Sequence, residues 1–178
     1  MRWDSLFADL EAQLDAEQRS ALDAEVAERV RIERRSVTLV DRLRAHVGHP
    51  LALDTGTHAV RGTVSEVGSD FVLLDAEGGG YALVPVAALE GVTGLGRAVA
   101  PPPGAVLRRL GLASALRGLV RDRAEVRLLT AGGEVRGVPA AVGADHVDLV
   151  PLRPGDLDAG PAAARSVPLA ALRVVRSR

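Results

Sequence analysis

The chain has 178 residues and a net charge of −1. This length is enough for one ordinary domain, or for two very small domains with an extension. It contains no cysteine, so disulfides, thiolate metal sites and cysteine nucleophiles are excluded. Apolar residues make up 47% of the chain but aromatic residues only 2%, so we expect cores of Val, Leu and Ala and few stacking platforms for bases.

The first predicted element is a helical segment over residues 1–46. It holds no Gly or Pro, and apolar residues recur every three or four positions, which is typical of an amphipathic helix. Asp15 or Ser20 can restart the helix after a bend, so one long helix and a helical hairpin both remain open. The apolar stripe predicts an interface, packed on the same chain or on another molecule, with six candidate residues: Trp3, Phe7, Leu10, Leu14, Leu22 and Val26. No run of 18 apolar residues occurs, so a cytoplasmic protein without a membrane partner is predicted.

Short runs rich in Val and Leu follow, and they predict two β regions, 47–96 and 114–178. Turns such as Gly68-Ser69-Asp70 and Gly78-Gly79-Gly80 separate the runs. Between the two regions, residues 97–113 form a linker stiffened by Pro101-Pro102-Pro103, which leads into a short helix over roughly 105–120.

The two β regions repeat one another. Two motifs recur at a spacing of 75, a third recurs at a spacing of 83, and a dipeptide before each region matches as well. The matching pairs are Arg61-Gly62 with Arg136-Gly137, Val67-Gly68-Ser69-Asp70 with Val142-Gly143-Ala144-Asp145, Val84 to Leu89 with Val167 to Leu172, and Leu43-Arg44 with Leu116-Arg117. Each copy is therefore predicted to be a helix followed by about five strands.

This order, with Gly62 in the second strand, resembles the Sm-like fold, the small bent barrel of the LSm proteins and of bacterial Hfq. The resemblance implies an α+β protein in which an N-terminal amphipathic helical segment (1–46) precedes two small Sm-like or SH3-like β-barrels (47–96 and 114–178). It also implies assembly through strand edges, by which three chains would imitate a ring of six barrels.

RNA binding is a further implication of the resemblance, but it depends in that family on loop residues that are largely missing here. The corresponding positions hold Asp70 and Phe71 in the first copy and Asp145 and His146 in the second. We interpret both aspartates as turn caps. The first β region carries one Arg and six acidic residues, a balance that repels phosphate backbones.

The connector is the basic part of the chain, since residues 97–121 carry five Arg and no acidic residue. Arg108, Arg109, Arg117 and Arg121 are the candidate contacts to RNA or DNA phosphates. Residues 110–117 resemble the helix-turn-helix of Fis-type transcriptional regulators, a label given to actinobacterial proteins of this layout. The repeat favours a simpler interpretation, in which this helix opens the second barrel.

Two catalytic or metal-binding interpretations receive little support. Asp54-Thr55-Gly56 matches the aspartic protease signature, but the second copy has no equivalent aspartate, so only a dimer would supply the partner carboxylate. A strand-connecting turn explains Asp54 as well. The four histidines lack metal-ligand spacing and are interpreted as isolated surface residues: His46, His49, His58 and His146.

The leading hypothesis is a non-enzymatic binding or scaffold protein, without metal or cofactor, that assembles with itself or with a protein partner and associates with RNA. The alternatives are a DNA-binding regulator that uses residues 105–121 and a dimeric aspartic protease.

Overall fold

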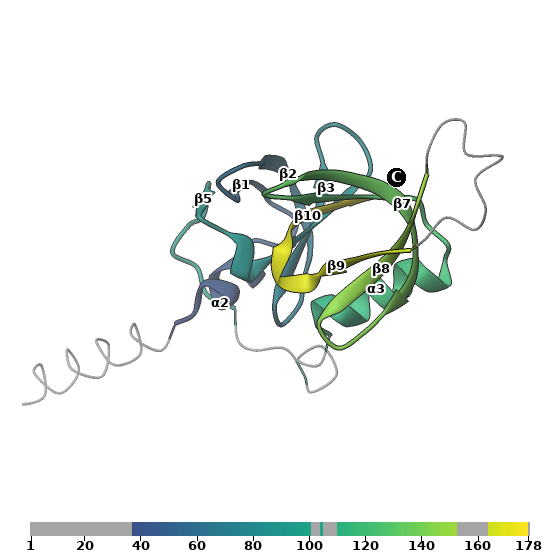
Figure 1. Cartoon of the computed structure of the whole chain (residues 1–178). Helices are drawn as coiled ribbons and strands as arrows, with labels where there is room; N and C mark the ends of the chain where they lie inside the picture. The colour runs from purple at the N-terminus through teal and green to yellow at the C-terminus, as the bar shows by residue number, and fades with distance from the viewer. Residues whose placement is uncertain (1–36, 101–103, 105–109, 153–163, 178) are drawn as a thin grey trace, which may run out of the picture. The chain divides into compact units, whose positions relative to one another are not determined.

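The structure is a computed structural model that describes residues 37–100, 104, 110–152 and 164–177 (Figure 1). The chain divides into two parts, Met1–Thr38 and Leu39–Arg178. The larger part holds all the helices and strands discussed below. Several predictions fall outside the described residues: the helix over most of 1–46, its candidate interface residues Trp3, Phe7, Leu10, Leu14, Leu22 and Val26, and the connector residues Arg108 and Arg109.

Each sequence repeat forms a short helix followed by five strands and a single 3-10 turn. The first β unit comprises α2 (Leu39–Arg44), β1 (Pro50–Asp54), β2 (Ala59–Val67), β3 (Phe71–Ala76), β4 (Tyr81–Pro85), η1 (Val86–Ala88) and β5 (Gly91–Thr93). The second β unit comprises α3 (Leu112–Arg121), β6 (Val126–Thr130), β7 (Gly133–Val142), β8 (His146–Pro151), β9 (Arg165–Pro168), η3 (Leu169–Ala171) and β10 (Leu172–Ser177).

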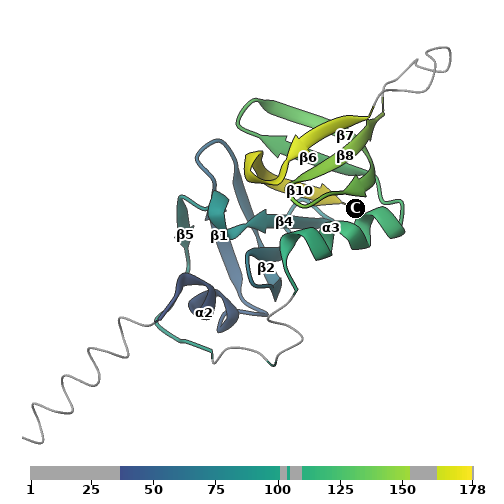
Figure 2. The ribbon, with the colours of Figure 1, turned by 60° about the horizontal axis from the view of Figure 1, so that its bottom comes forward.

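The strands of both units belong to a single antiparallel sheet. Its order is β5-β1-β2-β3-β4-β10-β6-β7-β8-β9, so each unit contributes its five strands in the same internal order. Figure 2 shows the blue strands of the first unit meeting the green and yellow strands of the second where β4 lies beside β10. The mainly β architecture with helices confirms the α+β prediction. The expected pair of closed barrels is not found, because the sheet remains open at β5 and at β9.

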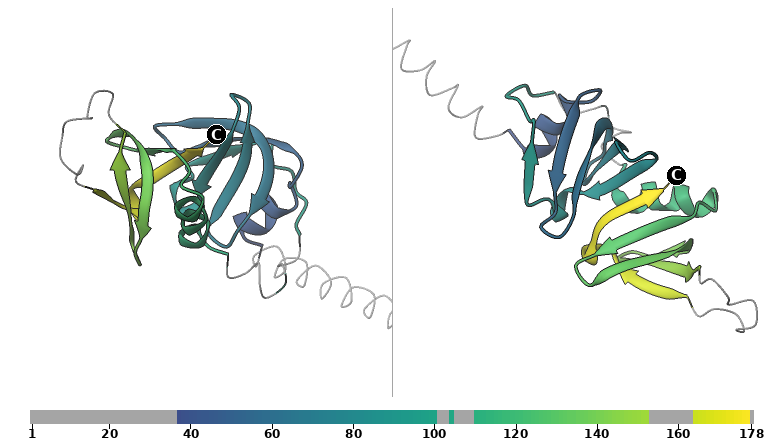
Figure 3. Two further views of the ribbon diagram at one scale, coloured as in Figure 1. Left: turned by 90° about the vertical axis from the view of Figure 1, so that its right-hand side faces the viewer. Right: turned by 90° about the horizontal axis from the view of Figure 1, so that it is seen from above.

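A glycine in the long second strand of each unit lets the neighbouring strand approach closely. A Cβ atom on Gly62 would clash with the carbonyl oxygen of Asp75, and one on Gly137 would clash with that of Val150. Each of these strands also has a register shift a few residues further on, between Val64 and Glu66 in β2 and between Pro139 and Ala141 in β7. Because such irregularities bend a strand, the two units curve at equivalent positions (Figure 3).

Two apolar cores lie along the sheet, and each draws residues from both units. The first is built on Leu43 of α2 and the inward side chains of β1 to β4, together with Leu129 and Val174 of the second unit. The second is built on Leu116 of α3 and β6 to β10, together with Phe71 and Leu83 of the first unit. The two β units therefore pack against each other through shared cores rather than folding as independent domains.

Candidate functional site

The junction between the units is an edge-to-edge strand pair. β4 and β10 run antiparallel, with Leu83 opposite Val175. Phe71, which is 2% exposed, and Leu83 are buried in the second core, where Leu116 also lies. The junction thus combines a backbone ladder with apolar packing, which is how an edge strand of one protein binds the sheet of another.

Helix α3 is anchored to the first unit at the same junction. The carboxylate of Asp70 accepts a hydrogen bond of 2.7 Å from the backbone N–H of Leu112, in the first turn of α3. The backbone N–H of Ser69 donates to the carbonyl oxygen of Leu110 at 3.0 Å. The prediction that Asp70 caps its own turn is therefore wrong. It caps a helix 42 residues away, where free N–H groups and the helix dipole favour a negative charge.

The open β9 end of the second unit presents the face that corresponds to the β4 face of the first unit at the junction, but with polar residues. By the repeat spacings of 75 and 83, Phe71, Leu73 and Leu83 correspond to His146, Asp148 and Ser166. The strand register agrees, since Leu73 lies opposite Leu83 and Asp148 lies opposite Ser166. The end of the sheet at β9 is thus a polar version of the face that β4 uses at the junction.

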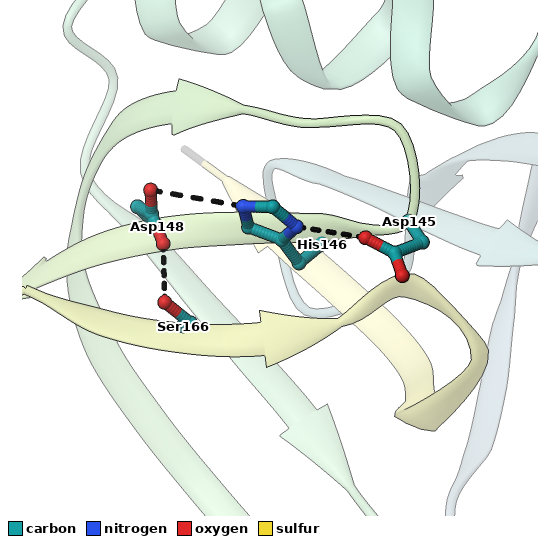
Figure 4. A network of polar contacts seen from close by, with 4 residues as sticks. All are labelled: Asp145, His146, Asp148 and Ser166. Carbon is teal, nitrogen blue, oxygen red and sulfur yellow. Dashed lines mark hydrogen bonds and ion pairs between the residues drawn. The ribbon is translucent and has the colours of Figure 1, made fainter.

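These polar residues form a network with the exposed Asp145 (Figure 4). His146 Nδ1 lies 2.8 Å from the Asp145 carboxylate, and Ser166 Oγ donates to the Asp148 carboxylate at 2.5 Å. The hydrogen bond between Asp145 and His146 raises the pKa of the imidazole and lowers the pKa of the carboxyl. Asp145 binds its neighbour His146 in the position where Asp70 binds a helix.

The open β5 end of the first unit carries an apolar groove of about 230 Å³. Its apolar lining residues are Leu39, Leu89, Val92 and Leu95, with Arg42 and Glu90 beside them. Three of these apolar residues have counterparts in the second unit that are buried in the core shared with the first unit. Leu39 corresponds to Leu112, Leu89 to Leu172 and Val92 to Val175. Leu39 is 38% exposed, whereas Leu112 is 6% exposed. The groove is therefore the first unit's version of the surface that accepts β4 in the second.

A buried histidine fixes one wall of this groove. The backbone N–H of Gly96 donates to His46 Nε2 at 2.8 Å, so Nδ1 carries the proton and donates to the carbonyl oxygen of Arg42 at 2.7 Å. The Arg42 guanidinium donates to the carbonyl oxygen of Gly96 at 2.7 Å. His46 is only 9% exposed, so its interpretation as an isolated surface residue is wrong. No periodicity marked His46 as buried, because it follows α2 in a turn.

The two connector arginines that the structure describes lie on α3. Arg117 and Arg121 are both exposed, while Leu112 and Leu116 on the same helix are buried and the helix packs on β7. The helix is therefore part of the second unit's core, and its arginines lie on the outer side.

The protease motif serves a turn. The backbone N–H of Gly56 donates to the Asp54 carboxylate at 2.9 Å, as expected for a strand-connecting turn. Within the described residues, no three His, Cys, Asp or Glu side chains are grouped so as to hold a metal ion. No helix in that same part of the chain is long and apolar enough to cross a membrane.

Comparison of the chain with known protein families and with curated protein sequences gives no match.

Proposed function

We propose that the chain is a non-enzymatic protein-interaction module, made of two tandem Sm-like units, whose open β5 edge binds an edge strand of another protein. The observation that carries this proposal is the β4–β10 junction. There the chain already binds one such strand on the surface that corresponds to the open groove.

The arrangement of strands supports the Sm-like part of the proposal. Each unit has a helix first and then five strands in the order fifth, first, second, third, fourth, with a glycine in the long second strand. The fourth strand of one unit pairs with the fifth strand of the next, which is the edge pairing that the resemblance implies. In the part of the chain that the structure describes, two edges of the same kinds, β5 and β9, pair with a strand on one side only.

The chemistry of the two open ends argues that the partner is a different protein rather than a second copy. If β9 of another copy took the place of β4, it would set His146, Asp148 and Ser166 against the apolar groove. Although Ser166 donates to Asp148 and His146 bonds Asp145, moving the Asp148 carboxylate and the His146 imidazole from water into an apolar groove is unfavourable. The partner should instead carry a leucine on its edge strand, where the first unit has Leu83, and an aromatic residue on the adjacent strand, where the first unit has Phe71.

A variant of this chain can serve as the probe. Changing His146→Phe, Asp148→Leu and Ser166→Leu together gives the β9 end the residues of the β4 face. We expect this triple variant to associate head to tail, with a light-scattering mass above that of the wild type. Adding Leu39→Glu, which places a charge in the groove, should return the mass to the wild-type value.

Three results would overturn the proposal. The groove does not bind such a strand if the triple variant keeps the wild-type mass, or if Leu39→Glu fails to reverse its association. The partner is a second copy if the wild type is itself an oligomer that Leu39→Glu dissociates. Circular dichroism of Leu39→Glu alone is the folding control, since this side chain is more than a third exposed.

A further inference from the structure

Three arginines form a row across adjacent strands at the junction. Arg127 on β6 lies directly opposite Arg136 on β7 and directly opposite Arg176 on β10. Residues directly opposite one another in a sheet project from the same face. The row covers two interstrand spacings, roughly 10 Å in all.

Such a row is unfavourable unless an anion compensates it, because like charges on directly opposite residues destabilise a sheet. Glu134 accepts a hydrogen bond of 2.8 Å from Arg136 and lies 3.9 Å from Arg127. The hydrogen bond from Arg136 lowers the pKa of Glu134, so this carboxylate already carries its charge. The Nε atom of Arg176 is covered and has no hydrogen-bond partner among the described residues. Glu125 lies near Arg136 and supplies a second negative charge, so three arginines against two glutamates leave the row with one uncompensated positive charge.

The row lines a groove of about 430 Å³ between the two units. The first unit contributes Gly78 and Gly79 from the β3–β4 turn and Tyr81 from the start of β4, and the second unit contributes the three arginines and Glu125. A volume of this size is typical of sites for small molecules.

The first unit does not repeat this feature. By strand register, Arg136 corresponds to Arg61, but Arg127 corresponds to Ala52 and Arg176 to Thr93. Two of the three arginines are therefore found only in the second unit, where the first unit closes the groove.

We propose that this groove binds a small ligand that carries two or more phosphate groups. Guanidinium groups bind phosphate oxygens through paired, charge-assisted hydrogen bonds. The row of three arginines is longer than a single phosphate group. A diphosphate or triphosphate chain is long enough to contact all three guanidinium groups. The ligand is either a free polyphosphate or the phosphate chain of a nucleotide, and neither involves the open β5 edge.

Calorimetric titration of the full chain with tripolyphosphate and with ATP tests the proposal. Both should bind, and Arg127→Ala, which removes the centre of the row, should weaken both by roughly tenfold or more. The matched control is Arg61→Ala, an exposed arginine at the position that corresponds to Arg136; it should leave binding unchanged. Tighter binding of ATP than of tripolyphosphate would identify the nucleotide as the source of the phosphates, and equal binding would identify the phosphate chain alone.

Unfolding of the ligand-free variants separates binding from folding. Arg127→Ala should melt no lower than the wild type, because it relieves like-charge repulsion. The proposal fails if neither probe binds at millimolar concentration, if Arg127→Ala binds as well as the wild type, or if Arg61→Ala loses binding equally. It also fails if only single-stranded oligonucleotides bind, since the site would then be a surface for a polymer.

Discussion

Replacing Phe71 by alanine tests whether apolar packing joins the two β units. Phe71 is 2% exposed and lies in the second unit's core although it belongs to the first. A buried aromatic side chain removes roughly 150–250 Å² from water. At about 25 cal/mol per Å², this amounts to about 4–6 kcal/mol as an upper bound. Phe-to-Ala changes in cores lower the free energy of unfolding by about 3–5 kcal/mol, and we expect a loss in that range here.

Urea unfolding followed by far-ultraviolet circular dichroism measures this loss. His146→Ala is the matched control, since His146 holds the position of Phe71 in the second unit but its side chain is 42% exposed. It should lower stability far less. Equal losses in the two variants, or a loss below about 1 kcal/mol for Phe71→Ala, would refute the role of the junction packing.

Three further changes test individual features of the fold. Gly137→Ala should lower the free energy of unfolding by about 1–3 kcal/mol, because its methyl group would overlap the Val150 carbonyl oxygen; Gly132→Ala, in an open turn, is the control, and similar losses would contradict the close-approach argument. Asp70→Ala should cost about 1 kcal/mol by uncapping α3, and Asp70→Asn should cost less because its amide oxygen still accepts the hydrogen bond; equal losses would show that the acceptor contributes nothing, and no loss in either variant would show that the cap does not stabilise the fold. The hydrogen bond that His146 donates to the Asp145 carboxylate raises the pKa of the imidazole, so the pair stabilises the fold below the unfolded-state pKa and loses this contribution as the pH rises through the folded-state pKa. NMR titration of His146 should show a lower pKa in Asp145→Ala, and an unchanged pKa would exclude the contact.

Much of each β unit could be predicted from the sequence because its signals are local. Alternating apolar residues and turn glycines indicate strands whatever their partners are. The equivalent glycines, Gly62 and Gly137, were found by comparing the copies, and the structure shows the close approach that requires them.

The junction could not be predicted in this way, because the comparison sought identities. The informative positions are those where the copies differ, above all Phe71 against His146 and Leu83 against Ser166. A position that is apolar in one copy and polar in the other indicates a surface that is covered in the first copy and exposed in the second. Such apolar-to-polar differences between the copies therefore indicate which strands lie at the junction.

The arginine row illustrates a different limit. Arg127, Arg136 and Arg176 are far apart in the sequence, and only the register of three strands aligns them. Register depends on pairing across the whole sheet, which residue composition does not encode. Burial of His46 was missed for a related reason, since its partner Gly96 lies 50 residues away.

The divergence of the β9 end bears on how such a chain evolves. A duplication that kept Phe71, Leu73 and Leu83 in both copies would produce a molecule whose two ends carry complementary apolar binding surfaces. Head-to-tail contacts of that kind close into rings or grow into fibres, depending on a small rotation that selection would have to control. In this chain the corresponding positions at the β9 end hold His146, Asp148 and Ser166, so this end is polar, whereas the β5 end carries the apolar groove. Under the proposed function, such a chain would bind the end of a row of similar units at its β5 edge and would not extend the row at its β9 edge.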